Sequence, residues 1–152
     1  MKTLAHSGDT AGILARLERI QPDLRPRWGR MSAHQMVCHV NDCFRMAIDG
    51  RPVRSVTGPG QRTLLKWIAL YAPMRWPVGI RTMPEVDPER KGTPPVGFAE
   101  DVAEMKVLFD RFIGEPNKLE GVMHPIFGRM SSAAWLRWGY LHTDHHLRQF
   151  GL

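Results

Sequence analysis

The spacing of apolar residues along the chain predicts an all-α protein with four main helices and one shorter helix. In each segment apolar side chains recur at intervals of three and four residues, and capping or helix-breaking residues lie at the ends. The clearest start is Ser32, because Gln35 completes an S-x-x-Q capping box. The expected helices cover residues 9–20, 32–49, 61–72, 98–113 and 131–150.

Two segments rich in helix breakers separate these helices. Residues 73–97 hold six prolines, and residues 114–130 hold two more. The chain has no strand alternation longer than a few residues, no internal repeat and no low-complexity segment. We therefore expect a single domain over residues 1–152, built as a four-helix bundle with a long irregular connection in the middle of the chain.

Composition narrows the class of protein. The chain has 152 residues, of which 43% are hydrophobic and 24% are charged, as in soluble globular domains. Its first residues lack the pattern of a secretory signal, and its most apolar stretch, residues 64–78, is shorter than the roughly 20 residues that span a bilayer. Cys38 and Cys43 lie on one expected helix and point in different directions, so we expect two reduced thiols. Together these features favour a cytoplasmic protein.

Three of the seven histidines lie close together in the last expected helix. His142 and His146 are four residues apart, so they lie one turn apart on one helix face and can converge on a metal ion. His142 and His145 form an alternative pair. At about 100° per residue, however, His145 lies about half a turn from the stripe that faces the core. His146 is therefore the better second ligand.

A third ligand is expected from another helix, as in metal sites built inside helical bundles. His39 is the strongest candidate, because it lies between Met36 and Cys43 at the spacing of an inward-facing seam. Three histidines leave one coordination position open, which is typical of catalytic rather than structural metal sites. Thr143 and Asp144 stand in place of the glutamate of H-E-x-x-H, so a zinc-protease site is excluded.

The segments that carry these histidines resemble the DinB/YfiT-like superfamily. The stretch HTDHHLRQFGL, preceded by HPIFGRMSSAAWLRW, is similar to the C-terminal signature of that superfamily, and WGRMSAHQMVCHVNDCF is similar to its first metal-ligand helix. The resemblance covers residues 9–152 and is loose over residues 50–97. Within the superfamily, the chain is similar to a bacterial branch known only as a domain of unknown function.

This resemblance implies a four-helix bundle of up-down-down-up topology that holds a divalent metal ion through three histidines. The first histidine of the family falls on His39, and the H-x-x-x-H pair falls on His142 and His146. Relatives include thiol S-transferases that use low-molecular-weight thiols, and others are regarded as metal-dependent hydrolases. We therefore expect a metal-dependent enzyme of the DinB-like class, a hydrolase or a thiol S-transferase, that acts on a small-molecule substrate. The alternative is a non-catalytic bundle that binds a metal or a small molecule.

A divalent ion with three neutral imidazole ligands can lower the pKa of a water or thiol at its open position. Zinc, nickel, iron and manganese all accept imidazole, so the ligand type does not determine which metal is bound.

Trp28 and His124 lie in loops just ahead of helices, at the expected open end of the bundle, where His124 either donates to a substrate or anchors its loop. We expect Cys43 to be a small core residue rather than a fourth ligand. We expect Asp42 to be a solvated surface charge rather than a partner of His39.

Residues 50–84 carry most of the excess positive charge. The chain has a formal net charge of +6, and this segment holds six arginine or lysine residues and no acidic residue, interleaved with Trp67, Tyr71 and Trp76. Such a segment can contact phosphates, an acidic substrate or an anionic membrane surface, or it can form a solvated face. No helix-turn-helix, zinc-finger or RNA-binding motif accompanies it, so we expect no sequence-specific binding of nucleic acid. A homodimer stays open, since the sequence gives no oligomeric state.

Overall fold

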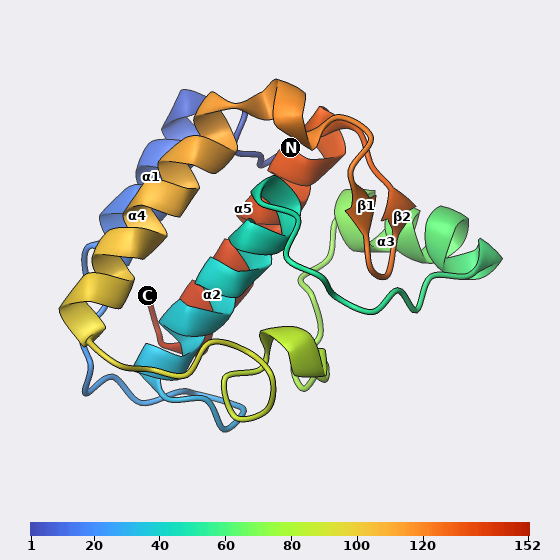
Figure 1. Ribbon diagram of the computed structural model, residues 1–152. Helices are drawn as coiled ribbons and strands as arrows, with labels where there is room; N and C mark the ends of the chain where they lie inside the picture. Colours follow the sequence, from blue (N-terminus) through green and yellow to red (C-terminus); the bar gives the residue numbers. More distant parts are fainter.

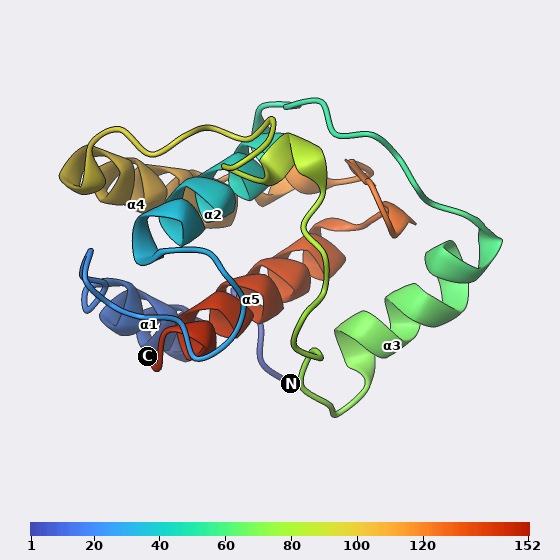
Figure 2. The same ribbon diagram turned by 90° about the horizontal axis from the view of Figure 1, so that it is seen from below.

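The computed structural model describes residues 1–152 and is mostly helical, as the sequence predicts. Its four long helices form two layers: α2 packs beside α4 in one layer, and α1 packs beside α5 in the other (Figure 2). These helices are α1 (Ser7–Leu17), α2 (Ala33–Ile48), α4 (Phe98–Gly114) and α5 (Ser132–Gln149). The face of α2 that carries the expected histidine ligand is turned toward α5.

The shorter elements gather mainly at one end of the layers, on the right in Figure 1. A π-helical turn runs directly into the short helix α3. Later in the chain, two strands of two residues each form an antiparallel β-pair. The β-pair was not expected, because two residues are too few to show an alternating pattern. These elements are η1 (Gln61–Leu65), α3 (Lys66–Tyr71), η2 (Pro84–Val86), η3 (Pro116–Leu119), β1 (Met123–His124) and β2 (Gly128–Arg129).

The helix starts follow the capping residues of the sequence. At α2 the hydroxyl of Ser32 accepts a hydrogen bond from the Gln35 amide at 3.1 Å, and the Gln35 side chain accepts one from the Ser32 amide at 2.8 Å. This arrangement is the predicted capping box, which satisfies two otherwise unpaired groups at the helix start. At α5 the hydroxyl of Ser131 accepts a hydrogen bond from the amide of Ala134, without the reciprocal bond. The expected helix over residues 9–20 is shifted, because it begins at Ser7 and ends at Leu17.

One hydrophobic cluster of 27 buried residues fills the space between the layers. Aromatic rings from three helices meet there: Phe44 of α2 contacts Phe112 of α4 with ring centroids 4.9 Å apart, and Phe112 contacts Trp135 of α5 edge to face at 6.5 Å. Met36 and Cys43 are also buried, which confirms the inward-facing seam of α2. The core therefore positions the histidine of that seam.

Asp42 was predicted to be a solvated surface charge, and this prediction is wrong. Its carboxylate is fully buried and accepts hydrogen bonds from the amide and the hydroxyl of Thr93, both at 2.7 Å. It also pairs with Arg45 and Arg51, each at 2.9 Å. The irregular segment after α3 folds over this side of α2 and covers a position that helical spacing alone assigns to solvent. Buried charges of this kind need partners, and here every partner is present.

Cys38 and Cys43 are both free thiols, as expected from their spacing. No helix of this structure combines the length and the apolar character that crossing a bilayer requires.

Gly139 of α5 lies where the neighbouring side chains leave no room for a Cβ atom. A Cβ atom there would lie 2.7 Å from Cε1 of Phe112 and 3.0 Å from Cδ1 of Leu4, both of which are buried. We expect Gly139→Ala to lower the free energy of unfolding by about 1–3 kcal/mol through overpacking, measured by denaturant titration. The matched control is Gly12→Ala on exposed α1, where nothing lies within 4 Å of the added atom. That change is expected to stabilise by about 0.5–1 kcal/mol, and equal effects of the two changes would contradict the close contact.

Candidate metal centre

Three buried histidines meet between the two helix layers. His39 of α2 faces His142 and His146 of α5, and one nitrogen from each ring lies within 4.8 Å of the other two. The Nε2 atoms of His39 and His142 are 3.3 Å apart. The three side chains are between 4% and 8% exposed. The structure thus brings together the three residues that the sequence analysis selected as metal ligands.

Hydrogen bonds at the outer nitrogens fix which atoms face the centre of this cluster. Nδ1 of His39 donates to the carbonyl oxygen of Val86 at 2.7 Å, and Nδ1 of His146 donates to Oε1 of Gln149 at 2.9 Å. The Gln149 amide is itself oriented, since its Nε2 donates to the carbonyl oxygen of Trp28 at 2.9 Å. With the proton on Nδ1, each of these two imidazoles presents a lone pair at Nε2.

His142 stacks on a tryptophan, and its outer nitrogen has no hydrogen-bond partner. Its ring lies against Trp138 with centroids 4.6 Å apart and an interplanar angle of 12°, and its Nδ1 has no partner. Two nitrogens held at about 2.0–2.1 Å from a tetrahedral ion are about 3.3–3.4 Å apart. The contact between His39 and His142 therefore has the spacing of two ligands of one ion, and the three-histidine set fits a divalent metal.

Burial also sets the charge of the three rings. It lowers the pKa of His39, and it lowers the pKa of His142 and His146 well below the ordinary value. The carbonyl of Val86 and the nearby charges of Asp42 and Asp87 offset part of this effect at His39. Neutral imidazole is the form that binds metals, so burial keeps these three side chains in a form that could hold an ion.

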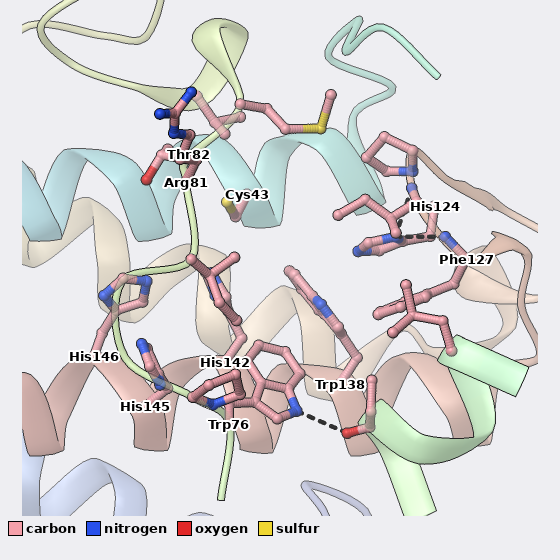
Figure 3. A pocket seen from close by; sticks show the side chains of 18 of the residues that line it. Cys43, Trp76, Arg81, Thr82, His124, Phe127, Trp138, His142, His145 and His146 are labelled. Atoms are coloured by element: carbon pink, nitrogen blue, oxygen red, sulfur yellow. Dashed lines mark hydrogen bonds between the residues drawn. The ribbon is translucent and has the colours of Figure 1, made fainter. Parts of the chain in front are cut away.

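Two cavities reach this cluster. A largely apolar cavity of about 450 Å³ touches all three histidines, and 14 of its 24 lining residues are hydrophobic (Figure 3). Trp76 and Trp138 line it beside His142. A polar cavity of about 510 Å³ reaches His146 from the side of Arg81. The histidine cluster is therefore open to small molecules although each ring is nearly buried.

His145 lies outside the three-histidine cluster, as its position in the helix predicts, but it is buried. It is only 8% exposed and lines both cavities, and its Nδ1 has no hydrogen-bond partner. The ring centroid of Trp28 lies 5.7 Å from that of His145. The ring centroid of Trp76 lies 6.1 Å from it (Figure 3). These two tryptophans belong to irregular segments that cover a face of α5 that helical spacing assigns to solvent. Burial, followed by the charge of Arg148, lowers the pKa of His145.

The same cause explains Arg137, which helical spacing also assigns to the solvent face of the last helix. The residue is 9% exposed, and its guanidinium donates to the carbonyl oxygens of Leu70 and Lys2. The end of α3 and the first residues of the chain cover this position.

The two loop residues predicted at the open end take different positions. His124 lines the apolar cavity, and its Nδ1 accepts hydrogen bonds from the amides of Ile126 and Phe127 at 3.1 and 3.2 Å. Its ring therefore organises the turn between β1 and β2. Trp28 lines the polar cavity and orients Gln149 through its carbonyl group. The sequence analysis did not identify Gln149 as a functional residue. Its position three residues after His146 on the same helix is the signal that could have found it, since this spacing brings it within reach of the His146 ring.

The two cysteines behave as core thiols. Sγ of Cys43 lies 3.7 Å from Nε2 of His39, but burial raises the pKa of this thiol, so it remains protonated. Cys38 belongs to a second group of potential ligands with His34 and Asp101. There His34 contacts the Asp101 carboxylate at 2.6 Å, and burial with that charge raises the pKa of Cys38 to about 12. The hydrogen bonds of this group join α2 to α4.

His124 gives the pH dependence of stability a specific source. Burial lowers its pKa from 6.5 to about 3, so between these values the unfolded chain binds a proton that the folded protein does not. Stability therefore falls as the pH falls below 6.5. In His124→Asn the amide oxygen can replace Nδ1 as acceptor, but it does not titrate. Between pH 7 and pH 5 the variant is expected to lose about 2 kcal/mol less unfolding free energy than the wild type, measured by denaturant titration. Parallel losses would contradict a buried neutral His124.

Comparison with known proteins gives a family without an assigned activity. The chain matches the family described as "Protein of unknown function (DUF1569)" over residues 5–151, nearly its whole length. No curated protein and no solved structure matches the chain. Both segments that supply the histidines lie inside the matched range. The chain therefore belongs to the DUF1569 family.

Proposed function

We propose that the protein is a metal-dependent enzyme of the DinB-like class, a hydrolase or a thiol S-transferase. In this proposal His39, His142 and His146, which all line the apolar cavity, would hold a divalent ion. One observation carries the proposal: three buried, neutral imidazoles converge at the wall of a cavity large enough for a small molecule. Zinc, nickel, iron and manganese all suit such a ligand set.

The directions of the helices support membership of the DinB/YfiT-like superfamily. In Figure 1 the chain runs one way along α1 and α5 and the opposite way along α2 and α4. This order is the up-down-down-up topology that the resemblance implies. The two parallel helices, α2 and α4, are joined by the long connection of residues 49–97, which contains η1, α3 and η2 and makes that crossover possible.

Different residues of the chain would have different roles at such a site. A divalent ion with neutral ligands supplies positive charge, which lowers the pKa of a water or a thiol. Trp76 and Trp138 provide flat apolar walls that orient a substrate and exclude water. His145 lies beside the cluster with a lowered pKa and an Nδ1 that has no hydrogen-bond partner, so in this proposal it accepts the proton. The substrate is accordingly a small molecule with an apolar part.

A non-catalytic metal- or small-molecule-binding protein is the second candidate. The observation in its favour is that no aspartate or glutamate lines the apolar cavity, so no carboxylate is placed to act as a general base there.

A measurement of catalytic turnover distinguishes the enzyme from the non-catalytic binding protein. The metal-loaded protein is assayed with a chromogenic ester, and separately with a low-molecular-weight thiol and an alkylating electrophile. An enzyme accelerates one of these reactions, and His145→Ala reduces that rate without removing the metal.

Metal content is the first test of the proposal. The purified protein, or the protein loaded with zinc or nickel and then desalted, is expected to retain one ion per chain by elemental analysis. His39→Ala and His146→Ala each remove one of three ligands and should abolish this retention. His145→Ala is the matched control, because His145 lies on the same helix and cavity wall but outside the three-histidine cluster. A wild-type protein that neither contains nor takes up an ion refutes the proposal.

Gln149 gives a second, graded test. Because its Oε1 holds the proton of His146 on Nδ1, Gln149→Leu is expected to weaken metal affinity about 10–100-fold, measured by competition with a chelating dye. Gln149→Glu keeps an acceptor at the same place and should preserve or increase the affinity. Unchanged affinity in Gln149→Leu would show that this hydrogen bond does not prepare the ligand.

A further inference from the structure

The segment around α3 gathers an unusual share of the exposed apolar surface. Of the 13 large hydrophobic residues that are exposed in the protein, eight lie between positions 64 and 80. We call these eight side chains the α3 face. They are Leu64, Leu65, Trp67, Ile68, Tyr71, Met74, Val78 and Ile80. Apolar residues scattered singly on a surface need no explanation, but a concentration of this kind indicates a surface that meets a partner.

The polarity of α3 is the reverse of that of a packed surface helix. Leu64, Ile68 and Tyr71 follow one another at intervals of four and three residues and are 65%, 36% and 40% exposed. On the side turned toward the protein, the Lys66 ammonium donates to the carbonyl oxygen of Arg129 at 3.1 Å. Only Leu70 is buried. In Figures 1 and 2, α3 projects from the two helix layers, so its apolar side is free to make contact.

Positive charge accompanies this apolar face. Residues 50–84 contain no acidic residue, and five of their six cations make no ion pair. These five are Arg54, Arg62, Lys66, Arg75 and Arg81. Arg51 is the exception, since it pairs with the buried Asp42. Trp76 is likewise turned inward, where its Nε1 donates to the carbonyl oxygen of Ala69 at 2.7 Å.

The exposed apolar residues and the unpaired cations together distinguish between two possible partners of the α3 face, a second copy of the chain and a membrane. A second copy bound through the same face would set these cations against each other, with no acidic group in the segment to compensate. Tryptophan, tyrosine and aliphatic side chains surrounded by unpaired cations match the boundary of a membrane that contains anionic lipids. We propose that the α3 face docks the protein on the surface of an anionic phospholipid bilayer.

The apolar cavity opens at this same face. Leu65, Ile68, Met74 and Ile80 belong to both the α3 face and the lining of the cavity. A bilayer against the α3 face therefore covers the cavity mouth, and an apolar molecule dissolved in the lipid can enter without crossing water. The docking itself does not depend on the metal chemistry proposed above, so the two ideas can fail separately.

Vesicle co-sedimentation of the full chain tests the docking. The protein is expected to bind vesicles of phosphatidylglycerol and phosphatidylcholine in equal parts, to bind pure phosphatidylcholine much more weakly, and to detach as salt is raised. Arg62→Ala with Arg75→Ala should weaken binding roughly fivefold for each removed charge, since a cation near such a surface contributes about 1 kcal/mol. Trp67→Ser should weaken it roughly tenfold through lost apolar contact.

The matched control is Lys106→Ala with Val107→Ser. Both residues are exposed on α4, which lies away from α3 in Figure 1, and these changes should leave binding unaltered. Circular dichroism checks that every variant is folded. Equal binding to neutral vesicles, or none to either kind, overturns the proposal. So does concentration-dependent dimerisation that Trp67→Ser abolishes, or capture of polyglutamate by a protein that ignores the vesicles.

Discussion

The buried carboxylate of Asp42 is the contact on which the candidate site depends. It binds both the amide and the hydroxyl of Thr93 and thereby fixes the irregular segment of residues 72–97 against α2. That segment contributes the carbonyl of Val86, which sets the protonated nitrogen of His39, and the side chain of Trp76 in the cavity wall. Apart from the short turn η2, this segment has no regular structure, and hydrogen bonds to the buried carboxylate hold it in place as part of the cavity wall.

The elements of the fold were predictable from the sequence because they depend on local rules. Helical spacing and the capping box at Ser32 located α2 within a residue or two, and the inward seam of that helix placed His39 in the core. The spacing of His142 and His146 on one face of α5 requires only the geometry of a helix. Convergence of the three residues follows once α2 and α5 face each other.

The errors share one physical origin. Helical spacing treats every position away from the core stripe as solvated, whereas irregular segments cover additional faces of α2 and α5. Asp42, Arg137 and His145 are buried for that reason. Nothing local in the sequence indicates that the loop containing Trp28 reaches the end of the last helix. The cavities and the hydrogen-bond partners of the ligands depend on such long-range contacts.

The loop ahead of α2 and the end of α5 hold each other at more than one point. The Arg27 amide donates to the Gln149 carbonyl at 2.6 Å, and a side chain at Gly29 would strike the Gln149 amide at 2.8 Å. Gln149 in turn orients His146, so the loop and the imidazole are thermodynamically coupled. Such coupling is reciprocal: whatever binds the lone pair of His146 also strengthens the attachment of the loop. Occupation of the centre would then appear as slower hydrogen exchange at a segment more than a hundred residues away in the chain.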